Sequence, residues 1–157
     1  MSCVAPGLFI GGKRTSSDLP WLQSHGITLV VNVTDDLPNI HPEHMSYIRI
    51  PLQDLPTASL NTAIADSGVL PSIALTIAAK NAVLVHCRAG SSRSASVILA
   101  YLVSQGSTLL NAYKMVSEIH PIKPNGGFAG MLVEYEVQTR GEATVVIDGF
   151  SNWKPVS

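Results

Sequence analysis

The chain has 157 residues, of which 46% are hydrophobic and 13% are charged. This length is typical of one domain, and the hydrophobic share is sufficient for a single core. Ten basic and eleven acidic residues give a formal net charge of −1. A near-neutral chain argues against nucleic acid as a partner, because each phosphate contact needs a basic side chain.

Signals for secretion and membrane insertion are missing from the sequence. The longest mainly apolar run, 95–103, is about half the length of a membrane-spanning helix, and the N-terminus lacks the basic start of a signal peptide. Two cysteines, Cys3 and Cys87, do not make a disulfide framework. We therefore expect a reduced protein of the cytoplasm, with the nucleus as an alternative, that has one domain over 1–150 and a tail over 151–157.

Strands and helices alternate along the predicted chain. Apolar, β-branched runs bounded by turn residues predict four strands, at 8–10, 28–33, 47–50 and 83–86. Residues 3–5 are expected to pair with 8–10 across the Pro6-Gly7 turn. Helical spacing predicts helices at 18–25, 92–104, 108–120 and 128–139, with two pieces inside 59–80 because Gly68 and Pro71 interrupt it.

The C-terminal residues complete this reading with a short strand at 144–147 and a loose end from Asn152. The order of elements predicts an α/β fold. We expect a central mixed, mostly parallel sheet of about five strands with helices on both faces.

The most informative stretch is His86-Cys-Arg-Ala-Gly-Ser-Ser-Arg-Ser94, between a predicted strand and a predicted helix. Such a unit directs backbone N–H groups and a helix N-terminus at one point, which favours binding of an oxyanion. Residues 90–92 are small, so the backbone can approach the anion closely. Arg93, six positions after Cys87, adds a guanidinium that can bind two oxygens. The same positive groups favour the thiolate of Cys87, which would make it a nucleophile.

His86 allows two interpretations. A histidine beside a nucleophile suggests a general base, but a strand residue next to Cys87 points to the opposite face. We expect His86 to support the loop through hydrogen bonds instead. The remaining histidines lack the spacing of metal ligands, so no metal site is predicted; they are His25, His41, His44 and His120.

His86-Cys-x-x-Gly-x-x-Arg-Ser94 resembles the phosphate loop of the cysteine-dependent protein tyrosine phosphatase superfamily, and Ala100-Tyr-Leu-Val103 is similar to the Ala-Tyr-Leu-Met of its dual-specificity members. Four other segments resemble landmarks of that family, at 6–11, 31–34, 50–54 and 124–128. The short, atypical dual-specificity phosphatases match best, down to a Gly-x-x-Thr-Val stretch at 141–145. The resemblance spans residues 3–147 and implies the protein tyrosine phosphatase-like fold.

The resemblance also implies a mechanism, in which phosphotyrosine and phosphoserine or phosphothreonine are hydrolysed through a phosphocysteine intermediate without a cofactor. Cys87 would attack phosphorus, Asp54 would protonate the leaving group, and Ser94 would help the thiolate leave in the second step. Asn125 would tie a neighbouring loop to the phosphate loop. The implied phosphate-binding residues are Arg88, Ala89, Gly90, Ser91, Ser92 and Arg93.

The general acid is the least constrained of these assignments. Position alone also allows Asp35, Asp36 or Asp66, and the Ile-Pro-x-x-Asp context at 50–54 favours Asp54 by resemblance.

The expected substrate is a phosphorylated protein, with a protein kinase among the candidates, and the expected state is a monomer. The chain is too short for the insertion that deepens the pocket of tyrosine-only phosphatases. Arg88 is the one extra cation at the variable loop positions. The alternatives are a phosphatase of a non-protein phosphomonoester (phosphoinositide, RNA or glucan) and a non-catalytic phosphoprotein-binding module, which typically lacks one of the catalytic residues.

Overall fold

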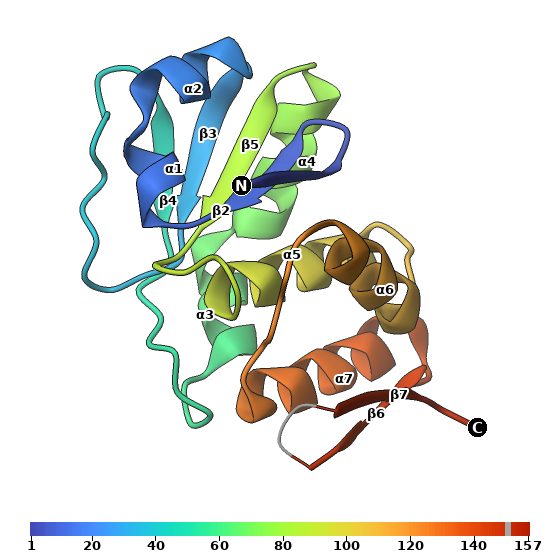
Figure 1. Ribbon diagram of the computed structural model, residues 1–157. Helices are drawn as coiled ribbons and strands as arrows, with labels where there is room; N and C mark the ends of the chain where they lie inside the picture. Colours follow the sequence, from blue (N-terminus) through green and yellow to red (C-terminus); the bar gives the residue numbers. More distant parts are fainter. Residues whose placement is uncertain (150–151) are drawn as a thin grey trace.

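The computed structural model describes residues 1–149 and 152–157 and contains a five-stranded sheet in the order β1-β2-β5-β3-β4 (Figure 1). β1 and β2 are antiparallel across the Pro6-Gly7 turn, whereas the other neighbours are parallel. The predicted mixed, mostly parallel sheet is therefore confirmed. Its strands are β1 (Ser2–Ala5), β2 (Leu8–Gly11), β3 (Ile27–Asn32), β4 (Ser46–Arg49) and β5 (Ala82–His86).

Helices cover both faces of this sheet, as expected (Figure 1). α1 and α2 lie against one face, and α4 and α5 pack on the other, with α3 packed against α4 and α7. The helices are α1 (Lys13–Ser17), α2 (Leu19–Ser24), α3 (Leu60–Ser67), α4 (Val69–Ala78), α5 (Arg93–Ser104), α6 (Leu109–Ile119) and α7 (Gly126–Arg140). The sequence pattern did not predict α1, which is short and exposes most of its residues, so it shows no apolar periodicity.

The predicted interruption between 59 and 80 falls at Gly68, which separates α3 from α4. Gly68 has φ +67°, and the two helices meet at a bend of 53°. A left-handed residue ends a helix at little cost only when it is glycine. Among the described residues, no single helix is long and apolar enough to span a membrane; the bent pair α3–α4 reaches that length and composition only together.

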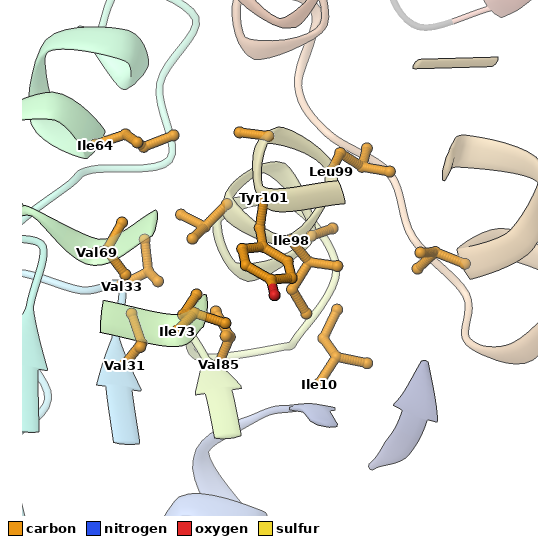
Figure 2. Packing of buried hydrophobic residues seen from close by; sticks show 14 of the residues in the cluster. Ile10, Val31, Val33, Ile64, Val69, Ile73, Val85, Ile98, Leu99 and Tyr101 are labelled. Carbon is orange, nitrogen blue, oxygen red and sulfur yellow. The ribbon is translucent and has the colours of Figure 1, made fainter. Parts of the chain in front are cut away.

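The core lies mainly between the sheet and α5. Figure 2 shows Ile10, Val31 and Val85 of the sheet facing Ile98 and Tyr101 of α5. Every residue of β5 is buried, and so are nearly all residues of α5. The segment between β5 and α5 is consequently held at both ends by the best-packed elements of the molecule.

The C-terminal segment corrects one expectation. Instead of a loose end from Asn152, β7 (Asn152–Pro155) pairs with β6 (Val145–Asp148) in an antiparallel hairpin. Trp153 stacks on Tyr113 of α6 with ring centroids 4.2 Å apart, which gives the strand an apolar anchor. The proposed domain boundary between 150 and 151 lies at residues outside those described.

A buried carboxylate joins α6, α7 and the C-terminal hairpin. Glu136 of α7 is fully buried and accepts hydrogen bonds of 2.7 Å from Leu109 N, Thr144 N and Thr144 Oγ1. Leu109 is the first residue of α6, so the carboxylate also faces the positive end of that helix. Nothing in the sequence pattern distinguished Glu136 from the solvated acidic residues of a surface helix.

Candidate active site

The loop between β5 and α5 turns its carbonyl groups outward. Five of its carbonyl oxygens accept hydrogen bonds from groups outside the loop or from the following helix. The bonds are His86 Nδ1 to Cys87 O (3.3 Å), Lys13 N to Arg88 O (2.9 Å), His120 Nε2 to Gly90 O (3.0 Å), Lys123 N to Ser91 O (2.6 Å) and Ser96 N to Ser92 O (2.9 Å).

This arrangement fixes the direction of the amide groups. In a planar trans peptide the carbonyl of one residue and the N–H of the next point in opposite directions. Because the carbonyls face outward, the following N–H groups face the inside of the loop. α5 begins at Arg93, so its N-terminus faces the same point. The loop has the electrostatic character of an anion-binding cradle.

Cys87 lies at the base of this cradle with 3% of its surface exposed. Its Sγ accepts a hydrogen bond of 3.3 Å from Gly90 N and lies 3.3 Å from Ser94 Oγ. An N–H donor aimed at the sulfur, beside a hydroxyl that is able to donate to it, favours negative charge there. The structure therefore places Cys87 and Ser94 together, in the arrangement that a thiolate nucleophile requires.

His86 is buried behind the loop and makes the support contact expected of it, through Nδ1 and the carbonyl of Cys87. Burial, together with the positive charges of Arg49 and Arg93, lowers the pKa of His86 to about 4, although the hydrogen bond to Cys87 O opposes the shift. The imidazole is thus neutral at physiological pH. Since the carbonyl can only accept, Nδ1 carries the proton.

The guanidinium of Arg93 is anchored at one end only. Nη1 donates to Leu52 O at 3.0 Å, whereas Nε is buried without a hydrogen-bond partner among the described residues. A buried guanidinium N–H without a hydrogen-bond partner costs free energy, so Arg93 Nε is placed to donate to an acceptor from outside the chain. An oxyanion in the cradle would supply that acceptor.

Asp54 reaches the phosphate loop from 33 positions earlier in the chain. Its Oδ1 accepts hydrogen bonds from Ser92 Oγ (2.7 Å) and Asn125 Nδ2 (2.9 Å), and Asn125 N donates to Ser92 Oγ (3.0 Å). Asn125 also caps α7 through its bond with Phe128 N. The loops of Asp54, Ser92 and Asn125 therefore form one connected unit, and Asn125 makes the link expected of it.

The other three candidate acids make different contacts. Asp36 Oδ2 is 2.6 Å from Arg88 Nη2, and this contact lowers the pKa of Asp36. Asp35 accepts a bond from Gln53 Nε2 (3.2 Å), and Asp66 lines a separate cavity of about 560 Å³ beside α3. The Arg88 side chain is half-exposed and paired with Asp36, while the Arg88 carbonyl accepts from Lys13 N.

A cavity of about 470 Å³ lies beside the cradle, between the loop of Asp54 and the start of α7. Asp54, Ser92 and Asn125 line it. At Gly127, in the first turn of α7, a Cβ would collide with the backbone carbonyl of Pro56. Glycine at this position lets α7 lie directly against the loop that carries Asp54. The sequence pattern did not identify this role of Gly127. The Gly-Gly pair just before a predicted helix was the available sign of a close backbone approach.

Comparisons with known proteins agree with this geometry. The family model described as "Dual specificity phosphatase, catalytic domain" matches residues 8–138. The chain is 38% identical to human dual specificity protein phosphatase 14 over 144 residues, covering 90% of this chain and 72% of that protein. The crystal structure of human DUSP28 superposes with a TM-score of 0.85 at 32% identity, covering 90% of this chain and 99% of that chain.

A mouse putative dual specificity phosphatase, crystallised as a complex with zinc tungstate, has a TM-score of 0.83 and 34% identity. The superposition covers 89% of this chain and 88% of the mouse chain. The chain belongs to the dual specificity phosphatase family. It is a protein phosphatase, a phosphoric monoester hydrolase of the protein tyrosine phosphatase superfamily, and its substrates are phosphoproteins.

Proposed function

We propose that this phosphatase binds the phosphate of its substrate in the cradle 87–93 and transfers the phosphoryl group to Cys87. The observation that carries this assignment is the convergence of inward amides, the unpartnered Arg93 Nε and the Cys87 sulfur on one point. Attack by the thiolate forms the sulfur–phosphorus bond as the ester bond to the leaving oxygen breaks. The amides and Arg93 stabilise the equatorial oxygens, on which charge is held in the transition state.

Asp54 is the proposed general acid. Both of its hydrogen bonds end on Oδ1, so Oδ2 is the oxygen available to carry the proton to the leaving group. In the second step the same oxygen takes a proton from water, the water oxygen attacks phosphorus, and the thiolate leaves. The Ser94 hydroxyl, 3.3 Å from Sγ, assists by donating to the departing sulfur.

The rim of the site favours phosphoproteins of broad side-chain specificity. Asp54 is exposed, which leaves the acid accessible to short phosphoserine and phosphothreonine as well as to phosphotyrosine. Arg88, the extra cation of the loop, is occupied by Asp36, so the rim offers little attraction to headgroups with several phosphates. A phosphorylated protein kinase is one candidate substrate, on the strength of the family resemblance alone.

Three variants test the assignment in one assay. Cys87→Ser should abolish turnover of p-nitrophenyl phosphate, yet retain binding of tungstate by calorimetry. Asp54→Asn keeps the Oδ1 contacts but removes the acid; it should slow a phosphoserine peptide by about 100-fold or more and p-nitrophenyl phosphate much less, because p-nitrophenolate leaves unprotonated. Asp35→Asn, on the neighbouring loop, is the matched control and should be near wild type.

Two results would redirect the assignment. Turnover by Cys87→Ser above about one thousandth of wild type would rule out the covalent route. Equal losses on both substrates for Asp54→Asn would move the acid role to another residue. A panel of phosphopeptides, phosphoinositide and phosphoglucan then separates a protein substrate from the alternatives, and binding of phosphopeptide without turnover by the wild type would indicate a non-catalytic module.

A further inference from the structure

His120 connects the phosphate loop to the N-terminal strand of the sheet. It is half-buried, directly after the last turn of α6. Its Nε2 lies 3.0 Å from Gly90 O, and its Nδ1 lies 2.8 Å from Ser2 Oγ in β1. A carbonyl oxygen can only accept, so Nε2 carries the proton and Nδ1 accepts from the Ser2 hydroxyl. The ring is oriented from both sides.

The peptide that His120 holds follows the one glycine of the loop sequence. Gly90 has φ +73°, and a glycine crosses between backbone regions with less steric hindrance than other residues. A flip of the peptide between Gly90 and Ser91 would turn the Gly90 carbonyl into the cradle and the Ser91 N–H out of it. One amide donor would then be replaced by an acceptor facing the phosphate, which is repulsive.

Burial lowers the pKa of His120, with a smaller contribution from the positive N-terminus, while the bond to Gly90 O opposes the shift. The neutral ring is therefore the form that presents one donor to Gly90 and one acceptor to Ser2. Neither His120 nor Ser2 contacts the reacting atoms in this arrangement.

We propose that His120 is a positioning residue of the phosphatase reaction: by holding Gly90 O outward, it keeps the Ser91 N–H directed at the bound phosphate. Ser2 acts through His120, because its hydroxyl fixes the tautomer and the angle of the His120 ring. The inference rests on the proposed function, since it assumes that the cradle is where phosphate binds.

The test measures anion affinity directly, so it does not depend on turnover. In a Cys87→Ser background, His120→Leu should weaken tungstate binding on the order of tenfold, the loss expected when one hydrogen bond to the cradle is misdirected. His120→Gln keeps an N–H donor at similar reach and should recover most of that affinity. Ser2→Ala should show a smaller loss in the same direction. His44→Leu, at an exposed histidine whose side chain pairs with Glu43, is the matched control.

Kinetic measurements distinguish a role of His120 in positioning the phosphate loop from a role in the stability of the fold alone. In the active enzyme, His120→Leu should reduce kcat/KM for p-nitrophenyl phosphate and for a phosphoserine peptide by the same factor, because the acid is untouched. Wild-type tungstate affinity in folded His120→Leu would overturn the inference, even if its melting temperature fell. If His120→Leu does not fold, wild-type affinity in Ser2→Ala together with a tenfold loss in His120→Gln would overturn it.

Arg93→Ala in the same Cys87→Ser background separates the two hypotheses. If Arg93→Ala also binds tungstate like its parent, the cradle is not the anion site and the proposed function fails. If Arg93→Ala loses binding and the His120 variants do not, only the role of His120 is wrong.

Discussion

Replacement of Gly127 by alanine should impair general acid catalysis without affecting phosphate binding. A Cβ at this position would lie 2.6 Å from the carbonyl carbon of Pro56, whereas ordinary van der Waals contact begins near 3.4 Å. One of the two segments must shift by about 0.8 Å, or more to accommodate the closer carbonyl oxygen. α7 is anchored by buried Phe128, while Pro56 lies in an exposed loop, so the loop should move.

The displaced loop carries Asp54 two positions before Pro56. A displacement of about 1 Å from the productive geometry can cost on the order of 100-fold in rate. Gly127→Ala should therefore reduce kcat/KM for a phosphoserine peptide by roughly 10- to 100-fold. The loss for p-nitrophenyl phosphate should be smaller, because its leaving group needs little protonation. Tungstate affinity should stay at the wild-type level, since the cradle itself is unchanged.

Gly130→Ala provides the control on the same helix. Nothing lies within 4 Å of a Cβ at Gly130, so alanine fits there and should stabilise the helix by up to about 1 kcal/mol. The assay compares both variants on both substrates, with thermal unfolding as a check on folding. Wild-type turnover of phosphoserine by Gly127→Ala would refute the reasoning, as would an equal loss in Gly130→Ala.

Other predictions concern the histidine behind the loop, the second chemical step and the buried carboxylate. Folding lowers the pKa of His86 from 6.5 to about 4. Between these two pH values the unfolded chain binds a proton on His86 and the folded chain does not, so the free energy of unfolding decreases as the pH falls from 6.5 to 4. Urea unfolding at pH 7 and 4.5 should show a loss of unfolding free energy that is smaller by about 2 kcal/mol in His86→Asn than in wild type; parallel profiles would contradict this. Ser94→Ala should slow thiolate departure by about tenfold and give a burst of p-nitrophenolate on rapid mixing, whereas a linear time course would place its role elsewhere. Glu136→Leu removes the acceptor of one buried donor, Leu109 N, and of two half-buried donors of Thr144, and it should cost about 3 kcal/mol of unfolding free energy, with Glu136→Gln closer to wild type. A loss below about 1 kcal/mol would mean that water replaces the carboxylate.

The sheet and most helices could be predicted because each is encoded by a local pattern. The apolar run of β5 and the Gly68 interruption between α3 and α4 are examples, and both lie where the sequence indicated. Two elements were not predicted, for two different reasons. α1 carries no apolar stripe, and β7 depends on the packing of Trp153 against Tyr113, 40 residues earlier in the chain. A pattern confined to a few residues cannot report a partner that distant.

At the active site, Cys87 and Arg93 could be assigned from a local sequence pattern, whereas the contacts of the residues around them could not. The six-residue spacing of these two fixes a turn between a strand and a helix, so the sequence alone determines that a sulfur, a guanidinium and a row of amides meet. Only the tertiary structure decided that Asp54 rather than Asp36 joins Ser92, and that His120 supports the loop from behind. Those contacts join segments about 30 or more residues apart, and their geometry is set by how the sheet, α6 and α7 pack together rather than by any neighbouring residue.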